Sequence, residues 1–87
     1  MDFDGIPQVK LQLFLYGTSA CHLCEQASAL LHDLRHEYDL CWTEIDITDN
    51  EGLMQRYGVK IPVLHRTDSA QELCWPFAIE DIRRFID

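Results

Sequence analysis

The stretch GTSACHLCEQ, residues 17–26, places two cysteines at the point where one pattern of apolar residues gives way to another. In the preceding segment VKLQLFLY, residues 9–16, apolar and polar residues alternate, which predicts a strand. Phe14 and Tyr16 make its second face apolar as well, so this strand is expected to be central in its sheet. From Cys21 to Tyr38 the apolar residues recur at three- and four-residue spacing, which predicts an amphipathic helix.

The segment after this helix predicts a second strand and a short second helix. LCWTEIDI, residues 40–47, has the alternation of a strand. In TDNE, residues 48–51, Thr48 is predicted as the N-cap of the helix, with Glu51 completing a capping box. This helix is expected to end at Tyr57, with Gly58 supplying a left-handed stop.

The C-terminal third predicts two strands and a closing helix. PVLHR, residues 62–66, and AQELCW, residues 70–75, are the strands, joined by a turn at residues 67–69. The closing helix carries apolar residues from Ala78 to Ile86, with Pro76 near its first turn. The order β-α-β-α-β-β-α predicts a single α/β domain over residues 9–87, preceded by a flexible arm over residues 1–8.

Composition narrows the classes of function. With 87 residues, of which 47% are hydrophobic, the chain suits one small folded domain. Its formal charge of −8 argues against binding nucleic acid or an anionic membrane. No apolar run approaches the roughly 20 residues of a membrane span. The N-terminus carries aspartates where a secretory signal has lysines, so a cytoplasmic location is expected. In that reducing compartment a paired CxxC favours catalysis or metal binding over a structural disulfide.

The two cysteines of the CxxC are expected to differ in chemistry. Cys21 is predicted at the first residue of the helix, and Cys24 lies one turn later on the buried row that continues through Ala27 and Leu31. Free N–H groups and the helix dipole at a helix start stabilise a thiolate and lower its pKa. Cys21 is therefore the expected nucleophile, and Cys24 the thiol that resolves the mixed disulfide.

Three further residues are candidates for the same site. His22 follows the nucleophile, and its imidazolium would stabilise the thiolate; a solvated histidine at a helix start explains it equally well. Pro62 stands at the entrance of a strand, where its missing N–H costs no ladder hydrogen bond. A cis Ile61–Pro62 bond would leave the N–H and C=O of Ile61 free for an extended substrate, although only about one X-Pro bond in twenty is cis.

Metal binding is the main chemical alternative. The spacing C-x2-C-x16-C-x32-C lacks the second closed pair of a zinc ribbon, so no metal site is predicted. Cys41 and Cys74 lie on predicted strands in apolar company and are expected to pack as small hydrophobic residues. Of the two, Cys74 is the candidate exception, because it is near the loop that should border the active site. His32 and His36 have the i, i+4 spacing of metal ligands but are expected on the solvated flank of the helix.

Together, these motifs resemble the thioredoxin-like superfamily. The resemblance rests on a strand ending in YGTSACHLC, the helix behind it, and YGVKIP opening the third strand, and it covers roughly residues 9–87. Length and strand number are closer to the glutaredoxins, and ELCWPF, residues 72–77, resembles small bacterial glutaredoxin-like proteins of largely uncharacterised function. The resemblance implies a four-stranded mixed sheet in the order 2-1-3-4, flanked by helices, with the last two strands antiparallel to the first pair.

The same resemblance implies roles for individual residues. Cys21 would be the nucleophile and Cys24 the resolving thiol. Pro62 would be the cis-proline that packs across from the disulfide, with Ile61 presenting its backbone to the substrate. Lys60, which flanks Ile61, would replace some of the positive charge found elsewhere in the family.

Several positions depart from the family pattern. His22 and Leu23 stand where glutaredoxins carry Pro-Tyr, Thr18 replaces a common lysine, Ala20 stands where thioredoxins carry Trp, and Trp75-Pro76-Phe77 replaces a Gly-Gly pair near the last helix. Neither glutathione nor a thioredoxin reductase therefore follows as a partner, and no cofactor is expected to be required. Trp75 and Phe77 would form an apolar lip beside the redox site or pack in the core.

The predicted function is that of a monomeric thiol–disulfide oxidoreductase. Its substrate would be a protein disulfide or a low-molecular-weight disulfide, and its reductant is not specified by the sequence. The alternative is a redox-inactive thioredoxin-fold binding module, or a carrier that holds an iron–sulfur cluster or a metal through Cys21 and an exogenous thiol. His22 and Cys24 weigh against the carrier, because such carriers usually have a monothiol motif with glycine after the cysteine.

Overall fold

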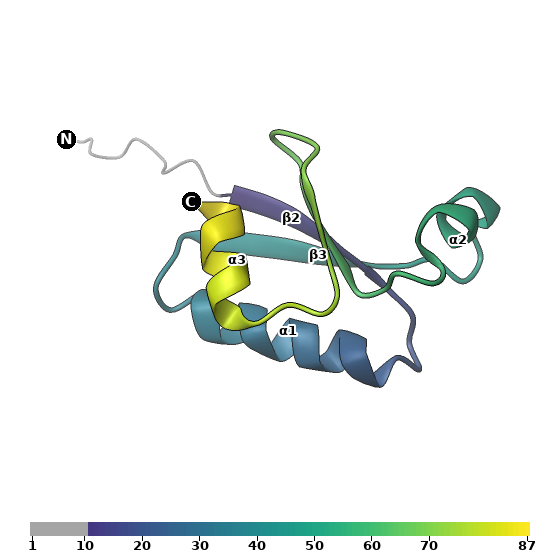
Figure 1. Cartoon of the computed structure of the whole chain (residues 1–87), viewed down its shortest axis with the longest axis horizontal. Coiled ribbons are helices and arrows are strands. Elements are labelled where there is room, and N and C mark those ends of the chain that lie inside the picture. Colours follow the sequence, from purple (N-terminus) through teal and green to yellow (C-terminus); the bar gives the residue numbers. More distant parts are fainter. Residues whose placement is uncertain (1–10) are drawn as a thin grey trace.

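The computed structural model describes residues 11–87, which form a four-stranded mixed sheet flanked by helices (Figure 1). Its strands are β2 (Leu11–Gly17), β3 (Leu40–Asp46), β4 (Val63–Arg66) and β5 (Glu72–Cys74). They lie in the order β3-β2-β4-β5, which confirms the expected order and the central place of the first strand. The arm expected over residues 1–8, and the expected strand start at Val9, lie outside the described residues.

The direction predicted for the last strand was wrong. β4 is antiparallel to β2, as expected, but β5 is antiparallel to β4 and so runs in the same direction as β2 and β3. The cause is the tight hairpin between β4 and β5, in which the N–H of Arg66 donates to the carbonyl of Gln71 at 2.9 Å. Strands joined by so short a loop must pair antiparallel.

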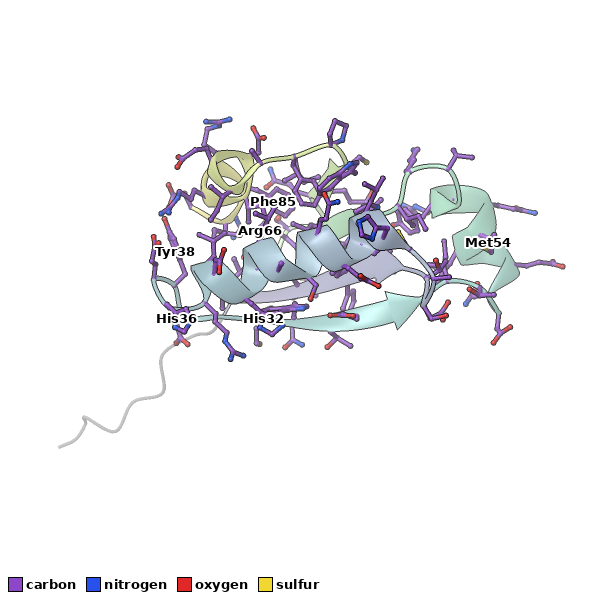
Figure 2. All side chains as sticks on the ribbon, turned by 90° about the horizontal axis from the view of Figure 1, so that it is seen from below. His32, His36, Tyr38, Met54, Arg66 and Phe85 are labelled. Atoms are coloured by element: carbon purple, nitrogen blue, oxygen red, sulfur yellow. A yellow bond between two sulfur atoms is a disulfide. The ribbon has the colours of Figure 1, made fainter. Side chains whose placement is uncertain are left out.

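The helices are distributed unequally about the sheet. α1 (His22–Leu34) and α3 (Ile79–Ile86) lie on one face, and α2 (Glu51–Tyr57) lies at one end of the molecule (Figures 1 and 2). Between the sheet, α1 and α3 lies the larger core cluster, whose buried residues are Leu13, Leu15, Ala27, Leu31, Leu34, Leu40, Leu64, Phe77, Ile82 and Ile86. A smaller cluster next to α2 contains Tyr16, Ile47, Tyr57 and Val63.

The first helix is shorter than its periodicity predicts. α1 ends at Leu34, whose carbonyl accepts the N–H groups of Glu37 and Tyr38 at 2.9 and 3.0 Å in a tightened final turn. Tyr38 still packs against the larger core cluster, which explains why the apolar spacing continues past the helix end. Likewise Pro76 precedes Ala78, the N-cap of α3, and lies outside the first turn of that helix.

The end of α2 at Tyr57 is confirmed, but its predicted N-cap and the predicted conformation of Gly58 need correction. Its N-cap is Asn50, whose Oδ1 accepts the N–H of Leu53 at 3.0 Å. Thr48 instead donates its N–H to Asp46 Oδ1 at 2.9 Å, in a turn that follows β3. Gly58 has a right-handed conformation, with φ −53°. No left-handed reversal occurs there, because the chain continues the right-handed turn and the N–H of Lys60 donates to the Tyr57 carbonyl at 2.8 Å.

The position of this cap can be tested by substitution. Asn50→Ala should lower the free energy of unfolding by about 1 kcal/mol, because the Leu53 N–H loses its acceptor. Thr48→Val keeps the backbone hydrogen bond to Asp46 and loses only an exposed hydrogen bond from its hydroxyl to the same carboxylate, so it should cost less than about 0.5 kcal/mol. Urea denaturation followed by circular dichroism measures both. A larger loss for Thr48→Val than for Asn50→Ala would contradict the assignment.

Candidate redox site

The CxxC lies at the junction of β2 and α1. β2 ends at Gly17, and the chain turns through residues 18–20, with the N–H of Cys21 donating to the Thr18 carbonyl at 3.3 Å. Cys21 is the N-cap of α1, one position earlier than predicted, because its backbone is extended. Its Sγ accepts the N–H of Cys24 at 3.1 Å, the bond that a serine or aspartate usually makes at this position.

Cys21 and Cys24 are joined by a disulfide, with 5.2 Å between their Cα atoms. The two sulfurs differ in environment. Cys24 is buried on the row that continues through Ala27 and Leu31, as the sequence predicted, whereas Cys21 is half-buried at the helix start. An incoming thiol or disulfide therefore has better access to Cys21.

Gly17 lies in close contact with the disulfide. A Cβ atom at this position would be 2.7 Å from Cys24 Sγ, closer than real Cβ contacts come, and 3.1 Å from Cys24 Cβ, which is tighter than most of them. The backbone of β2 thus packs directly against the buried sulfur. Glycine is required here by this close approach, since its φ is not positive.

Gly17→Ala should therefore destabilise the oxidised protein. Overpacking of this kind typically costs about 1–3 kcal/mol, and the disulfide prevents the Cys24 side chain from rotating away. Thermal unfolding of the oxidised protein should show a lowered midpoint, and the loss should be smaller in the reduced protein. Gly52→Ala is the matched control, because its Cβ would meet only Asn50 Oδ1 at 3.4 Å and alanine favours the helix. A Gly17→Ala protein as stable as wild type would refute the close contact.

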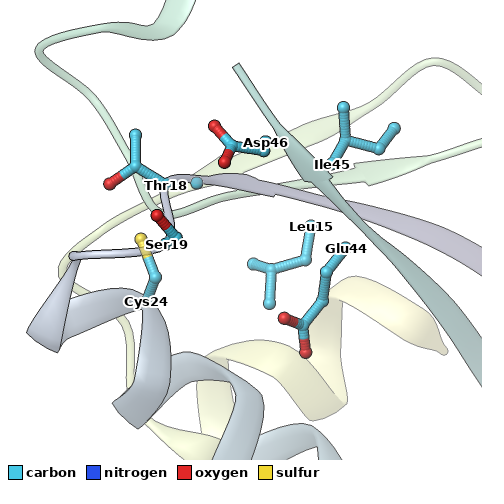
Figure 3. A pocket seen from close by; sticks show the side chains of 8 residues that line it. Leu15, Thr18, Ser19, Cys24, Glu44, Ile45 and Asp46 are labelled. Carbon is cyan, nitrogen blue, oxygen red and sulfur yellow. The ribbon is translucent and has the colours of Figure 1, made fainter. Parts of the chain in front are cut away.

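Two adjoining cavities open beside the disulfide. One, of about 200 Å³, is lined by Leu15, Gly17, Thr18, Ser19, Cys24, Glu44, Ile45 and Asp46. The other, of about 240 Å³, is lined by Thr18, Ser19, Cys21, Cys24, Glu25, Ser28 and Glu44. Figure 3 shows Cys24 at the first cavity, with Glu44 and Asp46 from strand β3 also lining it. Thr18, Ser19, Cys24 and Glu44 border both cavities, which we call the sulfur-side cavities.

The sulfur-side cavities carry three carboxylates, which sequence analysis missed. Glu44 Oε2 accepts a hydrogen bond from Ser28 Oγ at 3.0 Å, which fixes the carboxylate between α1 and β3. Hydrogen bonds from the side chain and the N–H of Thr48 lower the pKa of Asp46, despite a smaller opposing effect of burial. The third carboxylate is Glu25, in the first turn of α1. The predicted parallel pairing of the first two strands could have indicated Glu44 and Asp46, because it brings the C-terminal end of β3 beside the end of β2, where the CxxC follows.

His22 lies at the protein surface and not against the sulfurs. Its side chain is 83% exposed, and its Nδ1 lies 4.0 Å from Glu25 Oε1. No hydrogen bond joins its ring to either sulfur among residues 11–87. This geometry fits the solvated histidine better than a direct partner of Cys21.

Ile61 and Pro62 lie next to the end of β2. Tyr16 pairs with Val63, so one further step of the antiparallel register brings Pro62 beside Gly17. The Ile61–Pro62 peptide bond is cis, and the Pro62 carbonyl accepts the N–H of Trp75 at 3.1 Å. The expectation that both backbone groups of Ile61 are free was wrong. Its N–H donates to the Tyr57 carbonyl at 3.1 Å, because the turn after α2 continues to this residue.

The remaining candidates lie at the margins of the site. Lys60 is exposed and lines neither sulfur-side cavity. Trp75 is partly buried, packs against the larger core cluster and meets the Phe77 ring edge-on at 4.9 Å between centroids. Of the two explanations offered for Trp75, core packing is the one with contacts in the structure.

A tyrosine at the end of α2 ties this helix to the sheet. The Tyr57 ring stacks on Tyr16 with 4.3 Å between centroids, and its hydroxyl donates to Glu72. Burial and the hydrogen bond to Glu72 raise the pKa of Tyr57 above its usual value. The same carboxylate lies 3.0 Å from His65 Nδ1. These contacts fix the helix that leads into Ile61 and Pro62.

The other two cysteines lie too far apart to form a common site. Cys41 is on β3 and Cys74 on β5, the two opposite edges of the sheet. Cys41 is half-buried, but Cys74 is exposed, so the prediction that it packs as a small hydrophobic residue was wrong. His32 lies at the surface, with its ring edge-on to Trp42. Within residues 11–87, no three His, Cys, Asp or Glu side chains group as metal ligands would.

Fold and site together define a thioredoxin-like protein with a CxxC at the start of its first described helix. A family model described as "Glutaredoxin-like domain (DUF836)" matches residues 12–87, and the chain belongs to this family. No helix within the described part of the chain has the length and apolarity to cross a membrane.

Solved structures of similar proteins agree with this assignment. The protein Ne2328 of Nitrosomonas europaea is 31% identical, with a TM-score of 0.80 over 93% of this chain and 98% of its own. The structural-genomics target XcR50 of X. campestris is 35% identical, with a TM-score of 0.76 over 86% of this chain and 95% of its own. A mutant thioredoxin of Halobacterium salinarum shares the fold at 19% identity, with a TM-score of 0.66 over 88% and 72% of the two chains. No curated protein matches the sequence.

Proposed function

We propose that this protein is a dithiol–disulfide oxidoreductase in which Cys21 attacks the substrate and Cys24 resolves the intermediate. The observation that carries the proposal is the position of Cys21 Sγ as the N-cap acceptor of α1, within a disulfide to the more buried Cys24. In the reduced protein the same N–H group and the helix dipole would stabilise a thiolate on Cys21.

The reaction would proceed by two exchanges. The Cys21 thiolate attacks one sulfur of a disulfide R–S–S–R′, which forms Cys21–S–S–R and releases R′–S⁻, which takes up a proton. Cys24, deprotonated, then attacks Cys21 Sγ, releases R–S⁻ and closes the Cys21–Cys24 disulfide. Two electrons pass from the protein to the substrate, and a thiol reductant of a reducing compartment such as the cytoplasm would return them.

The residues that follow α2 would line the path of the substrate. Pro62 immediately precedes β4, one register step beyond the Tyr16–Val63 pair, and would pack next to the sulfurs. The carbonyl of Ile61 accepts no backbone N–H from the described residues and would be available to the substrate. Lys60, next to Ile61 and exposed, would face the same approach.

The proposal is tested by the thiolate absorbance near 240 nm of the reduced protein against pH. Cys41→Ser/Cys74→Ser provides the background, because it removes the two thiols outside the site. We expect a step with a pKa within about 3.5–7.5, the range of activated thiols, which disappears in Cys21→Ser. If every step in this background lies near the free-thiol value of about 8.5, Cys21 is not activated and the proposal fails.

Two further variants separate the roles of neighbouring residues. Cys24→Ser should accumulate a mixed disulfide on Cys21 when treated with 2-hydroxyethyl disulfide, detectable by mass spectrometry, because the resolving thiol is absent. His22→Ala should shift the Cys21 step by less than about one pH unit, since exposed charge pairs contribute only about 0.2–1 kcal/mol. A mixed disulfide on Cys24 in Cys21→Ser, with none on Cys21 in Cys24→Ser, would reverse the assignment.

A further inference from the structure

The space next to the sulfurs is negatively charged. Glu44 borders both sulfur-side cavities, Asp46 borders the first and Glu25 the second. Within the described chain, neither lining includes a lysine, an arginine or a histidine. The remaining polar lining consists of hydroxyl groups, from Thr18, Ser19 and Ser28, which can accept as well as donate hydrogen bonds.

We propose that this dithiol reacts preferentially with disulfides that carry an amine close to the sulfur, and poorly with anionic disulfides, glutathione disulfide included. This inference rests on the function proposed above and names the substrate class of the same site. The CxxC is the reactive centre, and the carboxylates determine which charges can approach it.

The location of the second cavity supports the proposal. Both Cys21 and Cys24 line it, so a group bound to Cys21 Sγ in the mixed disulfide lies at its border. Glu25 is four residues after Cys21 on the same helix, and Glu44 enters from β3. An ammonium group two or three bonds from the substrate sulfur would thus lie among carboxylates, whereas a carboxylate there would be repelled.

Three arginine side chains form ion pairs away from the sulfur-side cavities. Three arginines are paired with carboxylates remote from the site: Arg66 with Asp68, Arg83 with Glu37, and Arg84 with Asp81. They do not neutralise the acidic lining, beside which the exposed His22 ring lies 4.0 Å from Glu25 Oε1, and the net charge of −8 also favours cations. Clefts lined by charge of one sign concentrate ligands of the opposite sign and raise their association rates.

Hydrogen bonds hold the Glu44 and Asp46 carboxylates in the orientations from which they would select disulfides by charge. Glu44 is oriented by Ser28 Oγ and Asp46 by the N–H of Thr48. Both acceptors survive in the neutral isosteres, because an amide oxygen can take the same hydrogen bonds. Glu44→Gln/Asp46→Asn therefore removes charge with little change of shape.

The test uses three small symmetric disulfides that differ in charge: cystamine, 2-hydroxyethyl disulfide and 3,3′-dithiodipropionic acid. Fully reduced Cys41→Ser/Cys74→Ser protein is mixed with each at pH 7 and low salt, and formation of the Cys21–Cys24 disulfide is followed by quenched-flow trapping and mass spectrometry. Each rate constant is divided by that of dithiothreitol with the same disulfide, which removes differences in intrinsic reactivity.

We expect the normalised rate constant for cystamine to exceed that for the dianion by about 10- to 100-fold, within the range typical of electrostatic steering. The ratio should fall several-fold in 0.5 M salt, because exposed charges are then screened. Glu44→Gln/Asp46→Asn should reduce the ratio at least three-fold. The control Asp33→Asn/Asp87→Asn changes the net charge by the same amount, but at exposed positions outside both cavities. It should leave the cystamine-to-dianion ratio nearly unchanged.

The outcomes separate the two proposals. If 2-hydroxyethyl disulfide reacts through Cys21 but the normalised constants show no preference for cystamine, the charge selection is wrong and the oxidoreductase stands. An equal fall of the ratio in Glu44→Gln/Asp46→Asn and in the control also overturns it, because overall charge then explains the preference. If no disulfide reacts faster than with Cys21→Ser, both proposals fail. Glu44→Gln alone, with unfolding by urea measured alongside, provides the second variant if the double variant is unstable.

Discussion

The hydrogen bonding of β2 on both of its edges is the constraint on which the site depends. Parallel pairing with β3 brings Asp46 opposite Gly17, and antiparallel pairing with β4 brings Val63 opposite Tyr16. The sulfurs, the acidic side chains of β3 and the Ile61–Pro62 segment, which come from distant parts of the sequence, therefore converge at one end of one strand. A shift of either register by one residue would turn every side chain of that strand to the other face and separate these groups.

The order of elements and the larger core could be predicted from periodicity. Leu13 and Leu15 alternate with polar or less buried neighbours, and Cys24, Ala27 and Leu31 follow the helical spacing, so both patterns report the same buried face. These patterns are strong because many residues repeat one physical requirement, removal from water. The CxxC at the strand–helix junction could be predicted for the same reason, since the change of period locates the helix start.

Features that depend on single hydrogen bonds were predicted less well. Asn50 and Thr48 are both good N-caps, and only the course of the chain after β3 decides between them. The direction of β5 could have been derived from the short turn predicted at residues 67–69, which requires antiparallel pairing with β4. Sequence spacing did not show that Glu44 would turn toward Ser28. The acidic lining was missed because alternation identifies the face on which a carboxylate lies, but not the cavity that it borders.

The engaged N–H of Ile61 has a consequence for any polypeptide that reaches this site. An extended chain that pairs with another normally both gives and receives a hydrogen bond at each paired residue. At Ile61 the incoming chain would meet a carbonyl but no donor, because the N–H is already bound to Tyr57. Only one of the two backbone hydrogen bonds at Ile61 can then form. A polypeptide partner would have to be selected more by the groups around its sulfur than by its main chain.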